Sequence, residues 1–153
     1  MTFVIRSDDD MVAIENLKDH VIICGYGLVG EMVADILSQH DIPFVVIEMD
    51  HAKVEILTEK GINVVKGDCT SAKTLRKANI TKARALAVVL DDDAKNLFAV
   101  ITAKSLNSKI NIATRANEML IKDKLREAGA GFIATPNQSV GDELFDELLK
   151  GYG

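Results

Sequence analysis

The sequence predicts an α/β domain in which helices cover both faces of a doubly wound, parallel, six-stranded sheet. Two observations carry this prediction. From residue 21 onward, short runs rich in Val and Ile alternate with helical stretches in units of about 20–25 residues, as expected for strand–helix–strand crossovers. The first apolar run passes directly into a G-x-G-x-x-G turn, which joins a strand to a helix in nucleotide-binding folds. That turn is Gly25-Tyr26-Gly27-Leu28-Val29-Gly30.

Short apolar runs mark the strands. Runs without polar alternation are typical of strands that helices cover on both faces. Strands are predicted at 21–24, 44–48, 63–66, 85–90, 110–114 and 131–134. Pro43 stands immediately before the second run, where its missing N–H costs little. By analogy with folds that carry this glycine pattern, we expect the strand order 3-2-1-4-5-6.

Periodicity and capping residues mark the helices between the strands. Helices are predicted at 28–39, 51–60, 71–78, 93–106, 117–128 and 139–150. Asp50, Ser71 and Asn117 are suitable N-caps, because their side chains accept hydrogen bonds from first-turn amides. Gly61 and Gly129 each follow a helical stretch, where glycine commonly ends a helix.

Three segments are distinguished along the chain, whose length of 153 residues indicates one domain. Residues 1–20 form a lead-in segment that we expect outside the core. Residues 21–138 form a Rossmann-type domain. Residues 139–153 form a terminal helical segment.

Two helices carry more apolar surface than one sheet requires. The terminal helix has an apolar face with helical spacing, formed by Val140, Leu144, Phe145, Leu148 and Leu149. The helix at 93–106 carries Leu97, Phe98, Val100 and Ile101. Ordinary packing on the chain's own sheet is one interpretation. The other, which we favour, is at least a homodimer, and a tetrameric or octameric ring is compatible with it.

Composition argues against several classes of function. The net charge of −5 argues against nonspecific nucleic-acid binding, which needs a surplus of Lys and Arg. No apolar stretch reaches the roughly 18–20 residues that span a bilayer, so we expect a cytoplasmic chain. Cys24 and Cys69 have no C-x-x-C spacing and are expected to be small buried thiols.

The glycine turn has the chemistry of a phosphate site. Gly25 allows a sharp turn at the strand end, and Gly27 lets a pyrophosphate approach the backbone. Gly30 lets the helix pack closely on the strand. The free amides and the dipole of the helix N-terminus favour an anion. The alternative is a tight turn that binds nothing.

Glu48 ends the second apolar run, eighteen residues after Gly30. An acid at this offset accepts hydrogen bonds from the adenosine ribose, and its charge disfavours a 2′-phosphate. We therefore expect NAD(H), ADP or ATP as the ligand. The alternative is a solvated acid at a strand end.

No catalytic constellation is evident in the sequence. His20, His40 and His51 flank predicted elements, and solvated or capping roles are expected for all three. No Ser/His/Asp or Cys/His arrangement can be argued. We therefore predict that the chain is not an enzyme. A small NAD-dependent oxidoreductase is an alternative, although hydride transfer normally requires a second domain for the substrate.

Longer motifs resemble a known family. They are His20 to Gly27, Val45 to Glu48, Val65-Lys66-Gly67-Asp68-Cys69-Thr70, Leu75 to Ala78, Ala83-Arg84-Ala85, Asp91-Asp92-Asp93 with Asn96, and Ala128 to Pro136. Together they resemble the RCK domain (regulator of potassium conductance), also called the KTN or TrkA-N domain. The family forms cytosolic gating rings of prokaryotic potassium channels and regulatory subunits of Trk- and Ktr-type transporters.

The resemblance implies a set of ligand-binding positions. Gly25, Gly27 and Gly30 match the phosphate-binding turn, and Glu48 matches the ribose acid. Asp68 and Cys69 match the loop beside the adenine. Asp91 and Arg115 match positions that face the ligand or a dimer partner; helix capping and a surface ion pair are the alternatives. The implied cofactor-binding set is Gly25, Tyr26, Gly27, Leu28, Val29, Gly30, Glu48, Met49, Asp68, Cys69, Asp91 and Arg115.

Two departures from the family narrow the ligand. Some transporter members have a basic residue where this chain has Leu28, which weakens the case for a triphosphate. Calcium-gated members have a dense acidic run after the second strand, which Met49 and His51 interrupt here. A Ca²⁺ site, which needs about six or more oxygens, is therefore only weakly supported; Asp91 to Asp93 or an interface would have to build it.

The resemblance leaves three functions open. The first is a ligand-sensing domain at the inner face of the membrane, attached to a potassium pore, because a lead-in of 20 residues is similar to a pore-to-ring linker. In this interpretation residues 139–153 are the family's crossover helix, which packs on a partner subunit. The second is a regulatory subunit of a Trk- or Ktr-type transporter. The third is an oligomerisation module with a vestigial turn.

Overall fold

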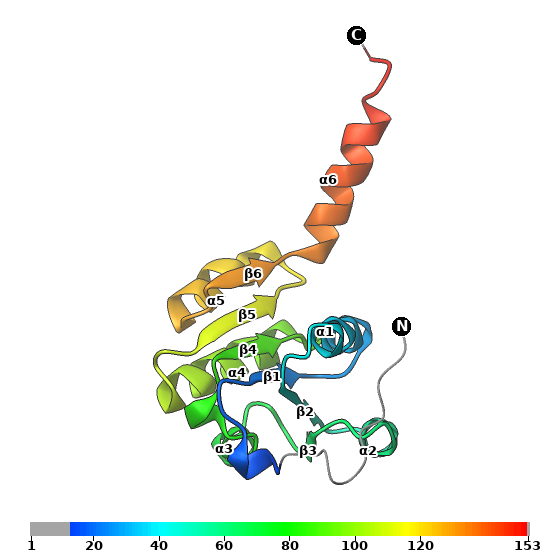
Figure 1. Cartoon of the computed structure of the whole chain (residues 1–153). Coiled ribbons are helices and arrows are strands. Elements are labelled where there is room, and N and C mark those ends of the chain that lie inside the picture. The colour runs from blue at the N-terminus through cyan, green and yellow to red at the C-terminus, as the bar shows by residue number, and fades with distance from the viewer. Residues whose placement is uncertain (1–12, 153) are drawn as a thin grey trace.

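A computed structural model describes residues 13–152 and confirms the predicted fold class (Figure 1). All strand pairs are parallel, and the sheet has the order β3-β2-β1-β4-β5-β6. The strands are β1 (Val21–Cys24), β2 (Phe44–Glu48), β3 (Val64–Lys66), β4 (Ala85–Val88), β5 (Asn111–Arg115) and β6 (Phe132–Ala134). The chain order reverses between β1 and β4, so the two halves of the sheet meet there.

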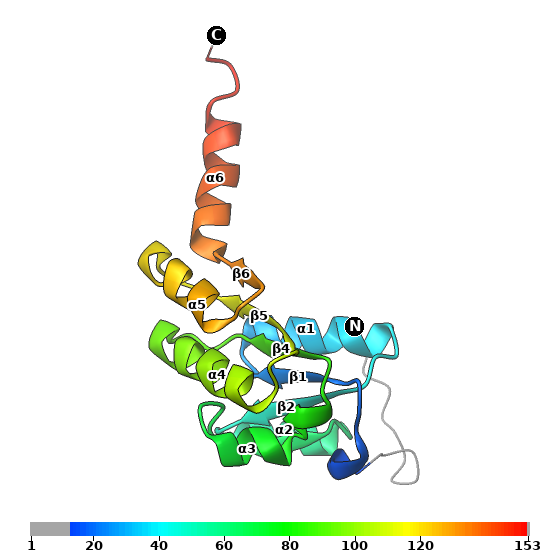
Figure 2. The same cartoon turned by 90° about the vertical axis from the view of Figure 1, so that its left-hand side faces the viewer.

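Helices cover the sheet in two layers (Figure 2). One layer contains α1 (Leu28–Gln39) and α2 (His51–Glu59); the other contains α3 (Ala72–Lys77), α4 (Asp93–Leu106) and α5 (Lys122–Ala128). Alternate strand residues supply the two cores. Ile22 and Val45 pack with the α3–α5 layer, whereas Ile23 and Val46 pack with α1 and α2. The alternation follows from the two-residue period of a strand.

Two helices differ from their predicted bounds. The helix predicted at 117–128 is a 3₁₀ turn, η4 (Met119–Ile121), followed by α5. Asn117 is not an N-cap, because its backbone and side chain bond to Asp93 and Asp91 and hold it outside the helix. The last helix, α6 (Pro136–Leu148), begins three residues earlier than predicted, with Pro136 in the first turn, where its fixed φ suits a helix. The N-caps Asp50 and Ser71 are confirmed.

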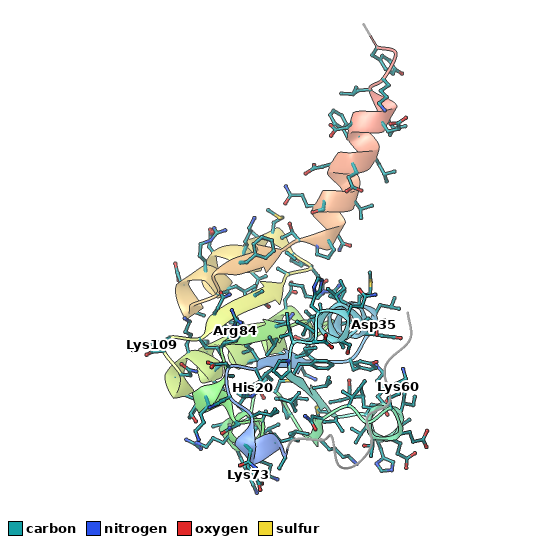
Figure 3. The ribbon with its side chains drawn as sticks, in the orientation of Figure 1. His20, Asp35, Lys60, Lys73, Arg84 and Lys109 are labelled. Atoms are coloured by element: carbon teal, nitrogen blue, oxygen red, sulfur yellow. The ribbon has the colours of Figure 1, made fainter. Side chains whose placement is uncertain are left out.

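The lead-in is anchored to the domain, which corrects part of the sequence prediction. Residues 1–12 of the predicted lead-in lie outside the described residues. After the 3₁₀ turn η2 (Ile14–Asn16), Leu17 is buried in the core. His20 is fully buried, not solvated, and its Nε2 lies 2.8 Å from the carbonyl of Ala78 (Figure 3). The side-chain amide of Asn79 donates to the carbonyls of Glu15 and Leu17.

The far half of the sheet has helices on one face only (Figure 1). On the face opposite α4 and α5, Phe132 is 66% exposed, and Ala113 and Ala134 are also exposed. α6 projects away from the body, and none of its residues is buried. This part of the molecule therefore presents two uncovered apolar surfaces.

Candidate functional site

A cavity of about 130 Å³ lies at the carboxyl ends of the strands. It is lined by Gly25, Ile47, Glu48, Met49, Gly67, Asp68, Cys69, Leu90 and Lys95. These residues come from the end of β2, from the loops after β1, β2, β3 and β4, and from the first turn of α4. In open α/β sheets, ligands bind outside the carboxyl ends of strands where the chain order reverses. The cavity occupies that position.

Packing explains two of the three glycines in the turn after β1. Gly25 has φ +100°, a left-handed conformation that side chains disfavour, and a Cβ there would lie 2.9 Å from the Leu90 side chain. A Cβ on Gly30 would lie 2.0 Å from the carbonyl oxygen of Gly25. Gly30 therefore allows α1 to begin against the turn, as predicted.

Gly27 is different, because a Cβ there would meet nothing within 4 Å. Its φ of −84° is open to any residue, and it precedes α1 without a side-chain cap. The amides of Leu28, Val29 and Gly30 belong to the first helical turn and have no acceptor within the helix. The turn thus presents amides and open space to an anion such as a phosphate. The residues present fit a nucleotide at this position.

Glu48 joins β2 to the glycine turn. One carboxylate oxygen accepts from the backbone N–H of Tyr26 at 3.0 Å, and the other from the N–H of Asp50 at 2.8 Å. Each oxygen keeps a lone pair for a further donor. The acid is therefore held in place at the cavity wall and can accept from a ligand hydroxyl.

The loop after β3 forms the opposite wall. A backbone and a side-chain hydrogen bond from Thr70, at 2.9 and 2.8 Å, both reach Oδ1 of Asp68. These bonds, with a smaller contribution from the charge of Lys95, lower the pKa of Asp68. Asp68 is thus an ionised acceptor at neutral pH.

The two cysteines are free and buried, as predicted. Cys69 lines the cavity, whereas Cys24, the last residue of β1, does not. A side-chain hydrogen bond with Cys69 and burial raise the pKa of Cys24 well above its usual value. Cys24 is therefore a protonated core thiol.

The structure separates the predicted site residues into two groups. Gly25, Glu48, Met49, Asp68 and Cys69 line the cavity. The others do not line it. The ring of Tyr26 is buried in the core beside α1, where burial and the charges of Glu31 and Asp35 raise the pKa of Tyr26 to about 12. The backbone amide of Tyr26 donates to Glu48. A role in ligand binding for Tyr26, Leu28 and Val29 stays a prediction.

Asp91 and Arg115 lie together, outside the lining of the cavity. Their side chains form an ion pair at 3.5 Å, in which the Asp91 side chain is almost fully exposed. Arg115 also donates to the side chain of Asn117 at 3.0 Å. The ion-pair interpretation is confirmed, and a role for these residues in ligand binding stays a prediction.

The aspartates after β4 act in local structure. Asp92 accepts from the amide of Lys95 as the N-cap of α4, and Asp93 accepts from the amides of Asn117 and Glu118. Their carboxylates are thus committed to backbone donors. Within residues 13–152, no cluster of three or more His, Cys, Asp or Glu side chains is arranged to hold a metal ion.

Sequence reasoning assigned no role to two residues that shape the site: Asn96, which appeared only within a family motif, and Lys95. Asn96 is fully buried and bonds to both the N–H and the carbonyl of Leu90, which fixes a cavity-lining residue. Lys95 lines the cavity from the first turn of α4. The helix after β4 begins where the strand order reverses, which is where ligands bind in such sheets. A lysine in the first turn of that helix could therefore have been recognised as a candidate site residue.

Comparison with known proteins places this geometry in a family. The sequence profile of the TrkA-N domain matches residues 21–136. The chain belongs to the TrkA-N domain family. The crystal structure of the TrkA-N domain of inner membrane protein ybaL from Escherichia coli superposes on this TrkA-N domain with a TM-score of 0.83. It shares 26% identity, and the match covers 87% of this chain and 98% of that one.

Longer proteins contain similar domains. Potassium channel protein 1 of Methanocaldococcus jannaschii is 41% identical over 136 residues, which is 88% of this chain and 41% of that protein. This TrkA-N domain therefore spans about two fifths of that relative. The crystal structure of GsuK bound to ADP has a TM-score of 0.71 at 25% identity, over 88% of this chain and 34% of that one. None of the helices within residues 13–152 has the length and apolar character needed to cross a bilayer.

Proposed function

We propose that this TrkA-N domain is a nucleotide-sensing regulatory domain of a potassium channel, located at the cytoplasmic face of the membrane. One observation carries the proposal: Glu48 is hydrogen-bonded to the glycine turn, and that turn has open space beside Gly27. The similarity to a potassium channel protein and to a protein crystallised with ADP supports it.

The cavity suggests how an adenine nucleotide binds. The ribose hydroxyls donate to Glu48, which already accepts from the turn that holds the phosphates. The adenine amine donates to Oδ2 of Asp68, because Oδ1 already accepts two bonds from Thr70. The phosphates lie on the first-turn amides of α1. A 2′-phosphate would meet the charge of Glu48, so NAD(H), ADP or ATP is preferred over a 2′-phosphorylated dinucleotide.

Calorimetry tests this proposal. Titration with NAD, NADH, ADP and ATP is expected to give saturable binding of at least one of them, and Glu48→Gln is expected to weaken it by about tenfold or more. Glu59→Gln, which alters an exposed carboxylate at the end of α2, is the matched control. Thermal unfolding of each variant separates lost binding from lost folding. If none of the four nucleotides bound at millimolar concentration, the proposed function would be wrong.

The uncovered surfaces support self-association as part of this function. An isolated helix of 13 residues is marginal in water, so α6 requires a partner for its apolar side chains. On the uncovered face of β5 and β6, the small side chains of Ala113 and Ala134 lie beside Phe132. This apolar surface could accommodate a helix from a second copy of the chain. We expect at least a homodimer. Light scattering is expected to show dissociation of Leu144→Asp, whereas Glu143→Lys, on the same helix, remains associated.

Occupancy of the cavity would then reach the pore through the assembly. A nucleotide that binds one arrangement of two domains better than another shifts their equilibrium. The alternative is that this domain regulates a transporter as a separate subunit. Electrical recording from the membrane protein that carries or binds this domain, with nucleotide added on the side of the domain, would show whether the domain regulates a channel or a transporter.

A catalytic role is not part of the proposal. None of the three histidines lines the cavity, and its ionisable lining consists of Glu48, Asp68, Cys69 and Lys95. We assign Glu48 and Asp68 to ligand recognition. The cofactor would act as a signal whose presence is sensed, without chemical change.

A further inference from the structure

The acidic side chains of the cavity are unfavourable for a ligand that carries negatively charged phosphates. Two carboxylates, those of Glu48 and Asp68, line it and repel an anion. The turn before α1 offers amides, but its exposed residue Leu28 has no charge, and the first turn of α1 contains the acid Glu31. A nucleotide with two or more phosphate charges therefore needs a cation from elsewhere in the site.

Lys95 is the one basic side chain in the cavity lining. It is the third residue of α4, and its backbone amide is fixed by the N-cap Asp92 at 3.0 Å. Its side chain is exposed and forms no ion pair within the described part of the chain. The ammonium group is thus available to a ligand. Its field is felt across the cavity, because it helps to lower the pKa of Asp68 after the larger effect of the Thr70 hydrogen bonds.

The sheet topology brings Lys95 close to the phosphate turn. β1 and β4 are neighbours, with Cys24 in register with Val88, and the amide of Val89 donates to the carbonyl of Cys24 at 3.1 Å. The chain then leaves both strands at the same edge, and Gly25 lies against Leu90. α1 and α4 begin there on opposite faces of the sheet, so their first turns flank the same edge, with Gly25 and Lys95 both in the cavity lining.

We propose that Lys95 neutralises the phosphates of the bound nucleotide and selects phosphorylated ligands over adenosine. This inference rests on the proposed nucleotide site and adds the residue that supplies its positive charge. The lysine crosses the cavity from α4 and takes the place of a basic residue that the glycine turn lacks at Leu28. Binding of ADP thereby joins the α1 half of the domain to the α4 half, whereas adenosine contacts only the walls after β2 and β3.

Calorimetry with ADP and with adenosine tests the role of Lys95. Lys95→Ala is expected to weaken ADP binding by about tenfold, because a charge-assisted hydrogen bond is lost, and to change adenosine binding by less than about twofold. Lys95→Glu is expected to weaken ADP binding further. The control is Lys109→Ala, an exposed lysine before β5 at the opposite end of the strands (Figure 3). It should leave both affinities unchanged.

Salt dependence gives a second readout. The affinity of the unaltered chain for ADP should fall as salt is raised, and Lys95→Ala should show a shallower dependence. Equal ADP affinities for Lys95→Ala and Lys109→Ala, or an equal loss for ADP and adenosine, would overturn the inference while leaving the nucleotide site intact. If the unaltered chain binds neither ADP nor any other adenine nucleotide, both the inference and the proposed function are wrong.

Discussion

The glycine turn permits a paired test, because Gly30 is required by close packing whereas Gly27 is not. In Gly30→Ala, the new Cβ would lie 2.0 Å from the carbonyl oxygen of Gly25, a backbone atom that cannot rotate away. In Gly27→Ala, the new Cβ meets nothing within 4 Å. The two variants thus add the same methyl group three residues apart, once into packed backbone and once into open space.

The contact distance sets the expected magnitude. Contacts of Cβ under 3.0 Å are essentially never seen, so α1 must move by about 1 Å relative to the turn. Overpacking of this kind costs about 3 kcal/mol, and replacing a helical glycine by alanine returns about 1 kcal/mol. Gly30→Ala should therefore lower the free energy of unfolding by about 2 kcal/mol. For a chain of this size, that lowers Tm by roughly 4–8 °C.

Gly27→Ala should cost less than about 1 kcal/mol, which reflects only the poorer N-cap. Its effect should appear in ligand binding, because the added methyl group occupies the space assigned to phosphate. Urea denaturation at one protein concentration measures the first quantity, and calorimetry with ADP the second. A Gly27→Ala variant that unfolds as easily as Gly30→Ala, or one that binds ADP normally, would refute this reasoning.

Three further predictions concern the surroundings of the site. Asn96→Ala should lower the free energy of unfolding by about 2–3 kcal/mol in urea denaturation, because it leaves part-buried backbone groups of Leu90 unpaired; a loss below about 1 kcal/mol would contradict it. Thr70→Val should raise the pKa of Asp68 in an NMR titration. Because the pKa of Asp68 is lowered in the folded chain, its contribution to stability is present above pH 3.8 and is lost as the pH falls through the folded value. The variant loses part of this contribution, so its acid unfolding should begin at a higher pH. Asn79→Ala should speed hydrogen exchange in the lead-in and destabilise the chain more than Asn79→Gly, because Asn79 has φ 60° and alanine adds strain there; equal stabilities would show that only the lost hydrogen bonds matter.

The sequence predicted the elements of the fold because each signal was local. Apolar runs, caps and the glycine turn act over a few residues, and they located every strand within two residues. Gly25 and Gly30 have the packing roles that the pattern indicates. The helix predicted from residue 117 failed, because long-range bonds from Asn117 to Asp91 and Asp93 outweigh helical periodicity.

The cavity was less predictable, because it is assembled from four separate loops. Glu48, the last residue of β2, was located by its spacing from the glycine turn, whereas Asp68 was located only through the family resemblance. Lys95 becomes a site residue only through the position of α4 beside β1. Tyr26 lies within the predicted turn, yet its side chain enters the core, and no local pattern distinguishes its two directions.

The measurement closest to the central claim is an NMR titration of the chain with ADP, in which amide shifts locate the ligand. We predict saturable shifts at Gly27 to Gly30, at Gly67 to Cys69 and at Lys95, with little change around Lys109. Saturable shifts centred elsewhere, or the absence of any saturable shift at millimolar ADP, would contradict the assignment of this cavity as a nucleotide site.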